Sequence, residues 1–274
     1  MPKPNKPRGV AVVGDLHAGS TVGLMPEGFT LDNGAPVGQS PEQKWLWACW
    51  LEWCKWLNDF ELNALIINGD LVQGVNGRDA QLMTGNEADM KRLCVQALEP
   101  LLYNKRKLRA QNIFVTRGTG WHSGGAGSRE ETIAELIGAH KDTLGRYSRF
   151  VNWMEWNGKV IHATHHISVA SVYPLTPLYR AQREMRERAQ RGYPMPDVDI
   201  RSHVHTCHAY ESTDNKWIVT APAWQMPTEF AHKVAPASHP SIGGLVIWLN
   251  GNRVEVSRKL FNLSKPSLMQ IVTT

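Results

Sequence analysis

The sequence predicts an α/β fold in which helices cover a largely parallel β-sheet. In the first half of the chain, short apolar runs typical of buried strands alternate with segments of helical periodicity. In the second half, Asn-Gly pairs separate strand-like runs and predict β-hairpins. Because the chain has no repeat, low-complexity run or break in composition, we expect one domain over 9–274, preceded by a disordered basic tail at 1–8.

Three apolar runs in the first half predict buried strands that meet polar loops at their ends. They lie at 10–13, 64–67 and 113–116, and the first two end in Gly-Asp. After the first strand, residues 18–40 are rich in Gly, Pro, Ser and Asn and predict a long loop. Loops of this length in a compact domain are often functional.

Helices are expected after each of these strands. The first begins at Ser40-Pro41, where Ser40 caps the helix, Pro41 suits its first turn and Gln43 completes a capping box. The others are expected over about 86–102 and from 129 to about 140. The first helix carries five tryptophans, whose spacing favours a buried face over an exposed platform for stacking nucleobases; they are Trp45, Trp47, Trp50, Trp53 and Trp56.

The second half predicts two hairpins with a basic helix between them. Asn157-Gly158 lies between strand-like runs at 150–156 and 160–164, and Asn250-Gly251 lies between runs at 245–249 and 254–256. A helix-prone stretch over 178–191 carries five arginines, and 217–220 predicts a further strand. The arginines fit a clamp for a second phosphate and equally a solvated helix face paired with Glu184 and Glu187.

Composition limits the classes of function. The net charge is +5 and the pI about 9.0, which favours anionic partners but fits equally a basic surface without one. The sequence has no signal-peptide pattern and no apolar stretch that would suggest a membrane span. The four cysteines show no CxxC spacing and no disulfide framework, so we expect a cytoplasmic protein with no membrane partner.

Metal-binding residue types recur at four expected strand ends. They are Asp15 with His17, Asp70, the group His162, His165 and His166, and the pair His203 and His205. Carboxylate oxygens and neutral imidazole nitrogens bind Mn²⁺, Fe or Zn²⁺. Side chains at the carboxyl ends of strands in an α/β sheet gather at one edge. We expect Asp15 and His17 to reach one ion, because i and i+2 in an extended segment point the same way.

These motifs occur in an order that resembles the calcineurin-like metallophosphoesterase superfamily. They are GDLH (14–17), NGD (68–70), RGTGWH (117–122), THH (164–166) and SHVH (202–205), and the resemblance spans about 10–249. It implies a four-layer αββα sandwich with two mixed β-sheets and a dinuclear metal site. It also implies two divalent metal ions, with Mn²⁺ expected first and Fe or Zn²⁺ as alternatives.

The resemblance assigns roles to the matching residues. Asp15, His17 and His205 would bind the first metal, Asp70 would bridge both ions, and His165 and His203 would bind the second. His166 is the alternative to His165, and His162 is expected to be in the core or to support a ligand. His122 would act as the catalytic acid. Arg117, Arg180 and Arg183 are candidates for binding phosphate.

The sequence departs from the family's pattern at three places. The third motif lacks the usual Asn ligand, for which Thr119 or a water would substitute. Ser202 replaces the usual Gly before the last HxH motif, which we expect to be tolerated. Gln73 stands where an acid is frequent, with no consequence expected for the metals.

The resemblance implies a phosphoester hydrolase, with a phosphodiesterase acting on nucleic acid or nucleotides as the first choice. A phosphomonoesterase, including a protein phosphatase, is the alternative within the fold. Two further alternatives remain from the residues themselves. One is a non-catalytic module that holds a nucleotide, which the missing Asn favours. The other is a single structural zinc site at 15, 17, 203 and 205, which its lack of cysteine ligands disfavours.

Overall fold

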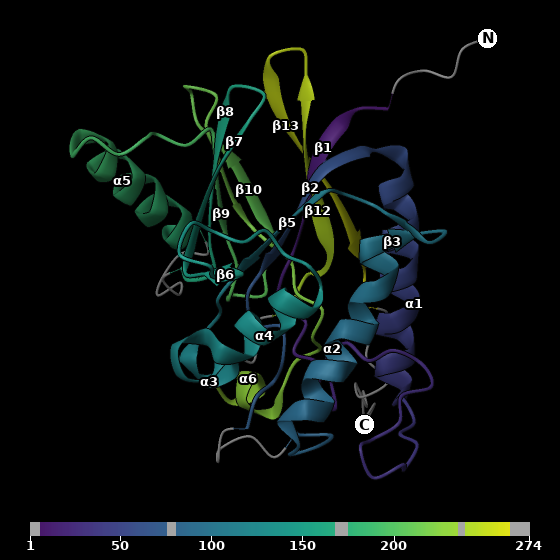
Figure 1. Ribbon diagram of the computed structural model, residues 1–274. Coiled ribbons are helices and arrows are strands. Elements are labelled where there is room, and N and C mark those ends of the chain that lie inside the picture. Colours follow the sequence, from purple (N-terminus) through teal and green to yellow (C-terminus); the bar gives the residue numbers. More distant parts are fainter. Residues whose placement is uncertain (1–5, 76–80, 168–174, 235–238, 264–274) are drawn as a thin grey trace, which may run out of the picture.

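Two mixed β-sheets lie face to face in the computed structural model of the chain, which describes residues 6–75, 81–167, 175–234 and 239–263. Helices cover the outer face of each sheet, so that the described elements stack as four layers (Figure 1). The α/β class and the four-layer αββα sandwich are therefore confirmed.

The larger sheet has six strands. Its order is β13 (Arg253–Phe261), β12 (Ile242–Asn250), β1 (Arg8–Val13), β2 (Glu61–Asn68), β5 (Asn112–Thr116) and β6 (Ser148–Arg149). The strands β1, β2, β5 and β6 run parallel, whereas β12 and β13 are antiparallel additions at one edge. The parallel strands carry their carboxyl ends to the same end of the sandwich.

The smaller sheet has five strands. Its order is β10 (His208–Glu211), β11 (Trp217–Thr220), β9 (Val198–Arg201), β8 (Lys159–Thr164) and β7 (Val151–Trp156). Strands β8 and β9 are parallel, while β7 joins β8 through the hairpin at Asn157-Gly158. Both turn residues have positive φ, as a two-residue hairpin turn requires.

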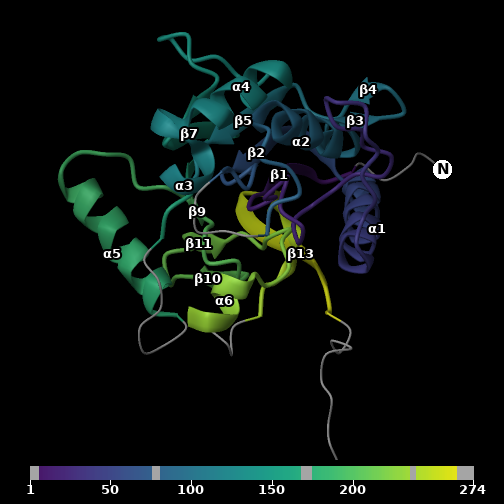
Figure 2. The same cartoon turned by 90° about the horizontal axis from the view of Figure 1, so that it is seen from below.

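The helices form the two outer layers. The larger sheet is covered by α1 (Pro41–Trp56), α2 (Glu87–Leu102) and α4 (Ser128–Leu136), and the smaller sheet by α5 (Thr176–Gln190). Two short helices, α3 (Gly120–Ser123) and α6 (Glu229–Val234), lie at the end where the parallel strands terminate (Figure 2). The small hairpin of β3 (Tyr103–Asn104) and β4 (Lys107–Leu108) precedes β5. No helix in the described part of the chain combines the length and apolarity needed to cross a membrane.

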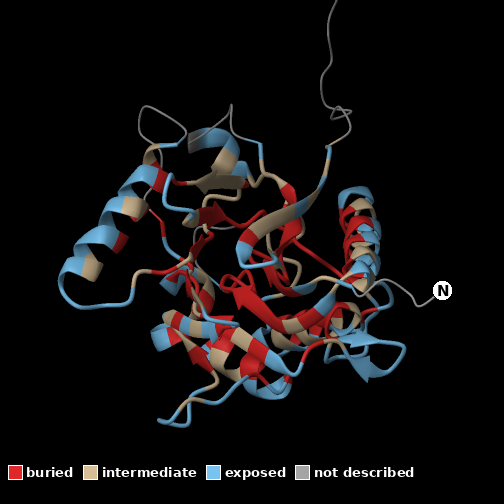
Figure 3. Cartoon of the chain, turned by 90° about the horizontal axis from the view of Figure 1, so that it is seen from above, coloured by how far each residue is buried: buried red, intermediate tan, exposed pale blue. Residues whose placement is uncertain are grey.

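Hydrophobic packing joins the layers, and buried residues concentrate along the central strands (Figure 3). Between the sheets, Val10, Val12 and Ile66 pack against Ile161 and Ile200. A larger core lies under the helices of the six-stranded sheet, where Trp50 and Trp53 are fully buried. The expected buried tryptophan face is confirmed for these two, while the other three tryptophans of α1 are half-buried.

Some expected boundaries were wrong. The strand β1 includes Arg8, the last residue of the expected tail; residues 1–5 lie outside the described residues. The helix expected to reach about 140 ends at Leu136, because Gly138 adopts φ +68° and Ala139 N–H bonds back to the Ala134 carbonyl. In the last hairpin, Asn250 is still paired with Arg253, so the turn lies one residue later than expected, at 251–252.

Candidate metal centre

The strand ends of both sheets bring metal-binding side chains into one cluster. Three sets of potential ligand atoms each lie within 4.8 Å of one another: Asp15, His17 and His205; His17, Asp70 and His122; and Asp70, His165 and His203. The structure thus brings together all six residues expected to hold metal, and His122 lies beside them.

The backbone at this cluster is unusual. Asp15, His17, Asp70, His203 and His205 all have φ between +47° and +75°, a region that non-glycine residues rarely adopt. Such conformations cost on the order of 1–3 kcal/mol each and concentrate at functional sites. Asp15 and His17 therefore converge through a left-handed turn rather than through the extended segment expected from their spacing.

Hydrogen bonds orient three imidazoles toward the centre. The Nδ1 atoms of His17, His122 and His165 lie 3.0, 2.6 and 2.7 Å from Gln73 Oε1, the Gln73 carbonyl and the Asn68 carbonyl. Because these oxygens accept, each Nδ1 carries the proton and leaves Nε2 for the centre. This arrangement is typical of metal-bound histidines.

Two buried polar atoms test whether the cluster fits a metal. Asp15 Oδ1 and His165 Nε2 are buried and lie 3.9 Å apart; His205 Nε2 lies 3.2 Å from the first and Asp70 Oδ2 lies 3.0 Å from the second, but neither contact has the geometry of a good hydrogen bond. His17 Nε2 and His205 Nε2 lie 3.2 Å from each other, and each can direct a lone pair toward the centre of the cluster. Buried polar atoms without a hydrogen bond are costly, and a cation between them would satisfy them. The donor set therefore fits divalent metal ions.

The electrostatics of the cluster favour positive charge at its centre. Burial alone raises the pKa of Asp15, but His205 and His165 outweigh it and hold the pKa well below its usual range. Burial lowers the pKa of His165, yet Asp70 and Asp15 raise it to about 10. Burial and His122 lower the pKa of His17 to about 4. A neutral His17 and an ionised Asp15 are the protonation states that metal binding needs, whereas His165 would release its proton when an ion binds.

The third motif lacks the usual Asn ligand, and its Thr119 supports the carboxylate of Asp70 instead. The Thr119 N–H donates to Asp70 Oδ1 at 2.7 Å, and its hydroxyl lies 3.2 and 3.3 Å from the two carboxylate oxygens. A Cβ at Gly118 would lie 2.0 Å from Asp70 Oδ1, so only glycine allows this approach. Thr119 thus positions the carboxylate that lies between the two ligand sets.

Two supporting residues were not expected from the sequence. Asn68 donates to the Ser202 hydroxyl at 2.7 Å and to the Thr164 carbonyl at 3.1 Å, which ties three strand ends together. Gln73 orients His17 and is itself held by Gln225 at 2.9 Å. Gln73 thus orients His17, an expected metal ligand, a contact that the sequence did not indicate.

The two other histidines near the cluster lie apart from the ligand sets. His166 is exposed, and its ring stacks over His203 with centroids 6.0 Å apart. His162 is buried on the outer face of β8 and bonds Asp199 at 2.7 Å. Arg201 bridges Asp199 to the His166 carbonyl, so this network supports the loop that carries His165.

The arginines expected to bind phosphate have other surroundings. Arg117 forms an ion pair with Glu131 at 3.1 Å and bonds the Ser148 hydroxyl. Arg180 and Arg183 lie on α5, which flanks the smaller sheet (Figure 1). Arg183 is 79% exposed and pairs with Glu187 at 3.2 Å. The pair Arg183–Glu187 is the kind of contact expected for a solvated helix face; a role of Arg180 and Arg183 in binding phosphate stays a prediction.

Glu130 is a buried carboxyl next to the metal centre. It lies on α4, accepts a hydrogen bond from the Ser123 hydroxyl at 2.7 Å, and its Oε2 has no hydrogen-bond partner in the described part of the chain. Burial, together with the charge of Asp70, raises the pKa of Glu130 to about 7, although the hydrogen bond from Ser123 lowers it. The folded protein therefore favours the protonated form.

We expect Glu130→Gln to reduce the pH dependence of stability. The contribution of protonated Glu130 is complete below its ordinary pKa of 4.5 and is lost as pH rises through about 7. Between about pH 5 and pH 8, the wild type should lose about 2–3 kcal/mol more unfolding free energy than the variant. Urea unfolding of chelator-treated protein measures this, with the exposed Glu135→Gln on the same helix as control. Parallel pH curves for wild type and Glu130→Gln would contradict the assignment.

Comparisons with known proteins give distant structural likenesses. No protein-family profile matches the sequence, and no curated protein sequence matches it. Vps29 from Entamoeba histolytica complexed with Zn²⁺ is similar in structure, with a TM-score of 0.41 and 11% identity over 93% of this chain and 99% of that one. An archaeal phosphodiesterase gives a TM-score of 0.45 and 12% identity over 92% of this chain and 99% of that one. A predicted phosphoesterase from Streptococcus pneumoniae gives a TM-score of 0.39 and 9% identity over 92% of this chain and 97% of that one.

Likenesses this distant transfer no activity, metal or partner. The class of fold is defined by the chain's own structure. It has four layers, and the sequence motifs meet at the ends of the strands. Together they define a four-layer αββα sandwich whose strand ends carry the motifs that resemble the calcineurin-like metallophosphoesterase superfamily.

Proposed function

We propose that this chain is a metal-dependent phosphodiesterase that holds two divalent metal ions, Mn²⁺ first among them, and acts on nucleic acid or nucleotides. The observation that carries the proposal is the meeting of three sets of potential ligand atoms around two buried carboxylates, Asp15 and Asp70. A bound cation would neutralise these carboxylates and accept the lone pairs of the imidazoles beside them.

The three ligand sets suggest how the ions would be shared. Asp15, His17 and His205 would hold one ion, His165 and His203 the other, and Asp70 would lie between them. When bound, such a pair of ions polarises the phosphate oxygens and lowers the pKa of a water molecule toward neutrality. The Thr119 backbone and hydroxyl would keep the Asp70 carboxylate in place throughout.

His122 is suited to proton transfer at the edge of the centre. Its ring lies 4.5 Å from that of His17, in an edge-on arrangement. Its Nδ1–H donates to the Gln73 carbonyl, which fixes the orientation of the ring. Its Nε2 is then the atom that would give a proton to the departing oxygen. Arg129 bonds the His122 carbonyl at 3.0 Å and holds the short helix α3.

Two measurements test the proposal. Metal analysis of the purified protein should find about two ions per chain. Hydrolysis of bis-p-nitrophenyl phosphate and of p-nitrophenyl phosphate, each with added Mn²⁺, then separates a diesterase from a monoesterase. Bound metal with no hydrolysis of either ester would favour the non-catalytic module, and absence of metal would refute the proposal.

A further inference from the structure

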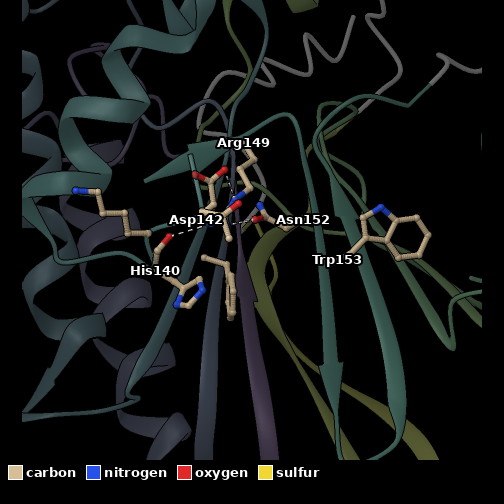
Figure 4. A pocket seen from close by; sticks show the side chains of 8 residues that line it. His140, Asp142, Arg149, Asn152 and Trp153 are labelled. Atoms are coloured by element: carbon tan, nitrogen blue, oxygen red, sulfur yellow. Dashed lines mark hydrogen bonds and ion pairs between the residues drawn. The ribbon is translucent and has the colours of Figure 1, made fainter. Parts of the chain in front are cut away.

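A cavity opens at the edge of the sandwich where the two sheets part. It has a volume of about 280 Å³, and its lining comes from β5, the loop after α4, β6 and β7 (Figure 4). Phe114 forms part of its wall, Lys141 and Arg149 lie along it, and Trp153 stands at its far side. The lining therefore combines aromatic rings with cationic side chains.

The segment around this cavity has an excess of positive charge. Between 140 and 153, three basic residues face a single acid, Asp142. Arg146 and Arg149 share that carboxylate, at 2.7 and 3.3 Å. The Lys141 ammonium lies 5.1 Å from the centre of the Tyr147 ring, which leaves its charge exposed at the surface. Arg149 also bonds Asn152 Oδ1 and the His140 carbonyl, so the exposed Lys141 is the cation that an anion at the cavity would meet most directly.

A chain of contacts connects this cavity to the metal centre. Arg149 accepts a backbone hydrogen bond from Arg117, which is two residues from Thr119 and its bond to Asp70. Phe150, next to Arg149, is 53% exposed and lies under the Arg117 guanidinium at 5.3 Å. The Phe150 carbonyl also accepts from the Thr164 hydroxyl, one residue before His165. Phe150 is therefore linked to the cavity wall through its neighbour Arg149, and to the segment that carries His165 through its own carbonyl.

We propose that Phe150 and this cavity form a subsite for single-stranded nucleic acid flanking the scissile phosphate, which rests on the function proposed above. Exposed aromatic rings stack with bases that are not held in a duplex, and cations beside them follow the phosphates. Phe150 and Trp153 supply two faces for stacking, and Lys141 and Arg149 supply the charge. A small diester would occupy the metal centre alone and would not reach these residues.

The test compares an oligonucleotide with a small diester. Binding of a fluorescein-labelled single strand of about 12 thymidylates is measured by anisotropy in a His122→Ala background, which limits cleavage. Phe150→Ala should weaken binding by about 10-fold. Lys141→Ala should lower the salt dependence of log affinity by about 0.7. The same substitutions in the wild-type background should leave kcat/KM for bis-p-nitrophenyl phosphate within about 2-fold, since neither residue belongs to the metal centre.

Matched controls come from the hairpin β3–β4, at the opposite end of β5. Tyr103→Ala removes an exposed aromatic ring and Lys107→Ala an exposed cation, and both should bind the single strand as the parent does. Equal affinity of Phe150→Ala and Tyr103→Ala would overturn the subsite, as would no binding of the strand by the parent. Hydrolysis of the small diester would still stand in that case. Loss of binding in Phe150→Ala alone, without diester hydrolysis, would keep the subsite and refute the proposed catalysis.

Discussion

Replacing Asp70 with asparagine should reduce bis-p-nitrophenyl phosphate hydrolysis by roughly 10³-fold or more. Asp70 belongs to two of the three ligand sets, so its charge would serve both metal ions. An amide keeps the shape but loses the negative charge, and with its oxygen turned to the Thr119 N–H it presents an NH2 group, which cannot bind a metal, at the position of Oδ2. The lost stabilisation of charge at a dinuclear site corresponds to several kcal/mol in the barrier.

The same variant should lose metal as well as activity. We expect metal analysis to give about one ion or fewer per chain, against about two for the wild type. Asp59→Asn, which changes an exposed aspartate after α1, should keep both the metal content and the rate. Far-UV circular dichroism would show whether the Asp70 variant remains folded. A folded Asp70→Asn protein with wild-type metal content and rate would remove Asp70 from the centre.

The fold was predictable wherever a local signal and the long-range packing agreed. The capping box at Ser40 and Gln43 and the Asn157-Gly158 turn each fix a boundary through contacts within a few residues, and both are confirmed. The helix expected to reach 140 shows the limit, because apolar periodicity continues past Leu136 while the left-handed Gly138 ends the helix. The last hairpin turn was misplaced because Asn250 pairs with Arg253 instead of entering the turn.

The residues expected to bind metal were predictable from the sequence, but the hydrogen-bond partners that orient them were not. Strand ends in an α/β sheet gather, so Asp15, Asp70 and the HxH pair were expected to meet. The partners that orient them lie far away in sequence: Gln73 is 56 residues from His17, and Asn68 is 134 residues from Ser202. No local pattern encodes such contacts. Local charge likewise left two alternatives for the arginines of α5, because it does not reveal ion pairs such as that of Arg183 with Glu187.

Removing the His122 side chain should lower turnover by about 10²–10⁴-fold while leaving the metal content near that of the wild type. His122 lies with His17 and Asp70 in one set, but the other two sets contain the six expected ligands without it. His122→Ala therefore should bind about two ions per chain and retain its fold. Loss of both ions in this variant would show that His122 is a metal ligand and not an acid.

The leaving group decides whether His122 acts by donating a proton. p-Nitrophenolate departs without much help, whereas a phenolate or alkoxide needs protonation as its bond to phosphorus breaks. The rate loss in His122→Ala should therefore be larger for a phenyl or alkyl diester than for the p-nitrophenyl diester. His208→Ala, on β10 at the far edge of the smaller sheet, controls for loss of a histidine elsewhere. Equal losses for all leaving groups would exclude proton donation and leave His122 a role only in positioning the substrate.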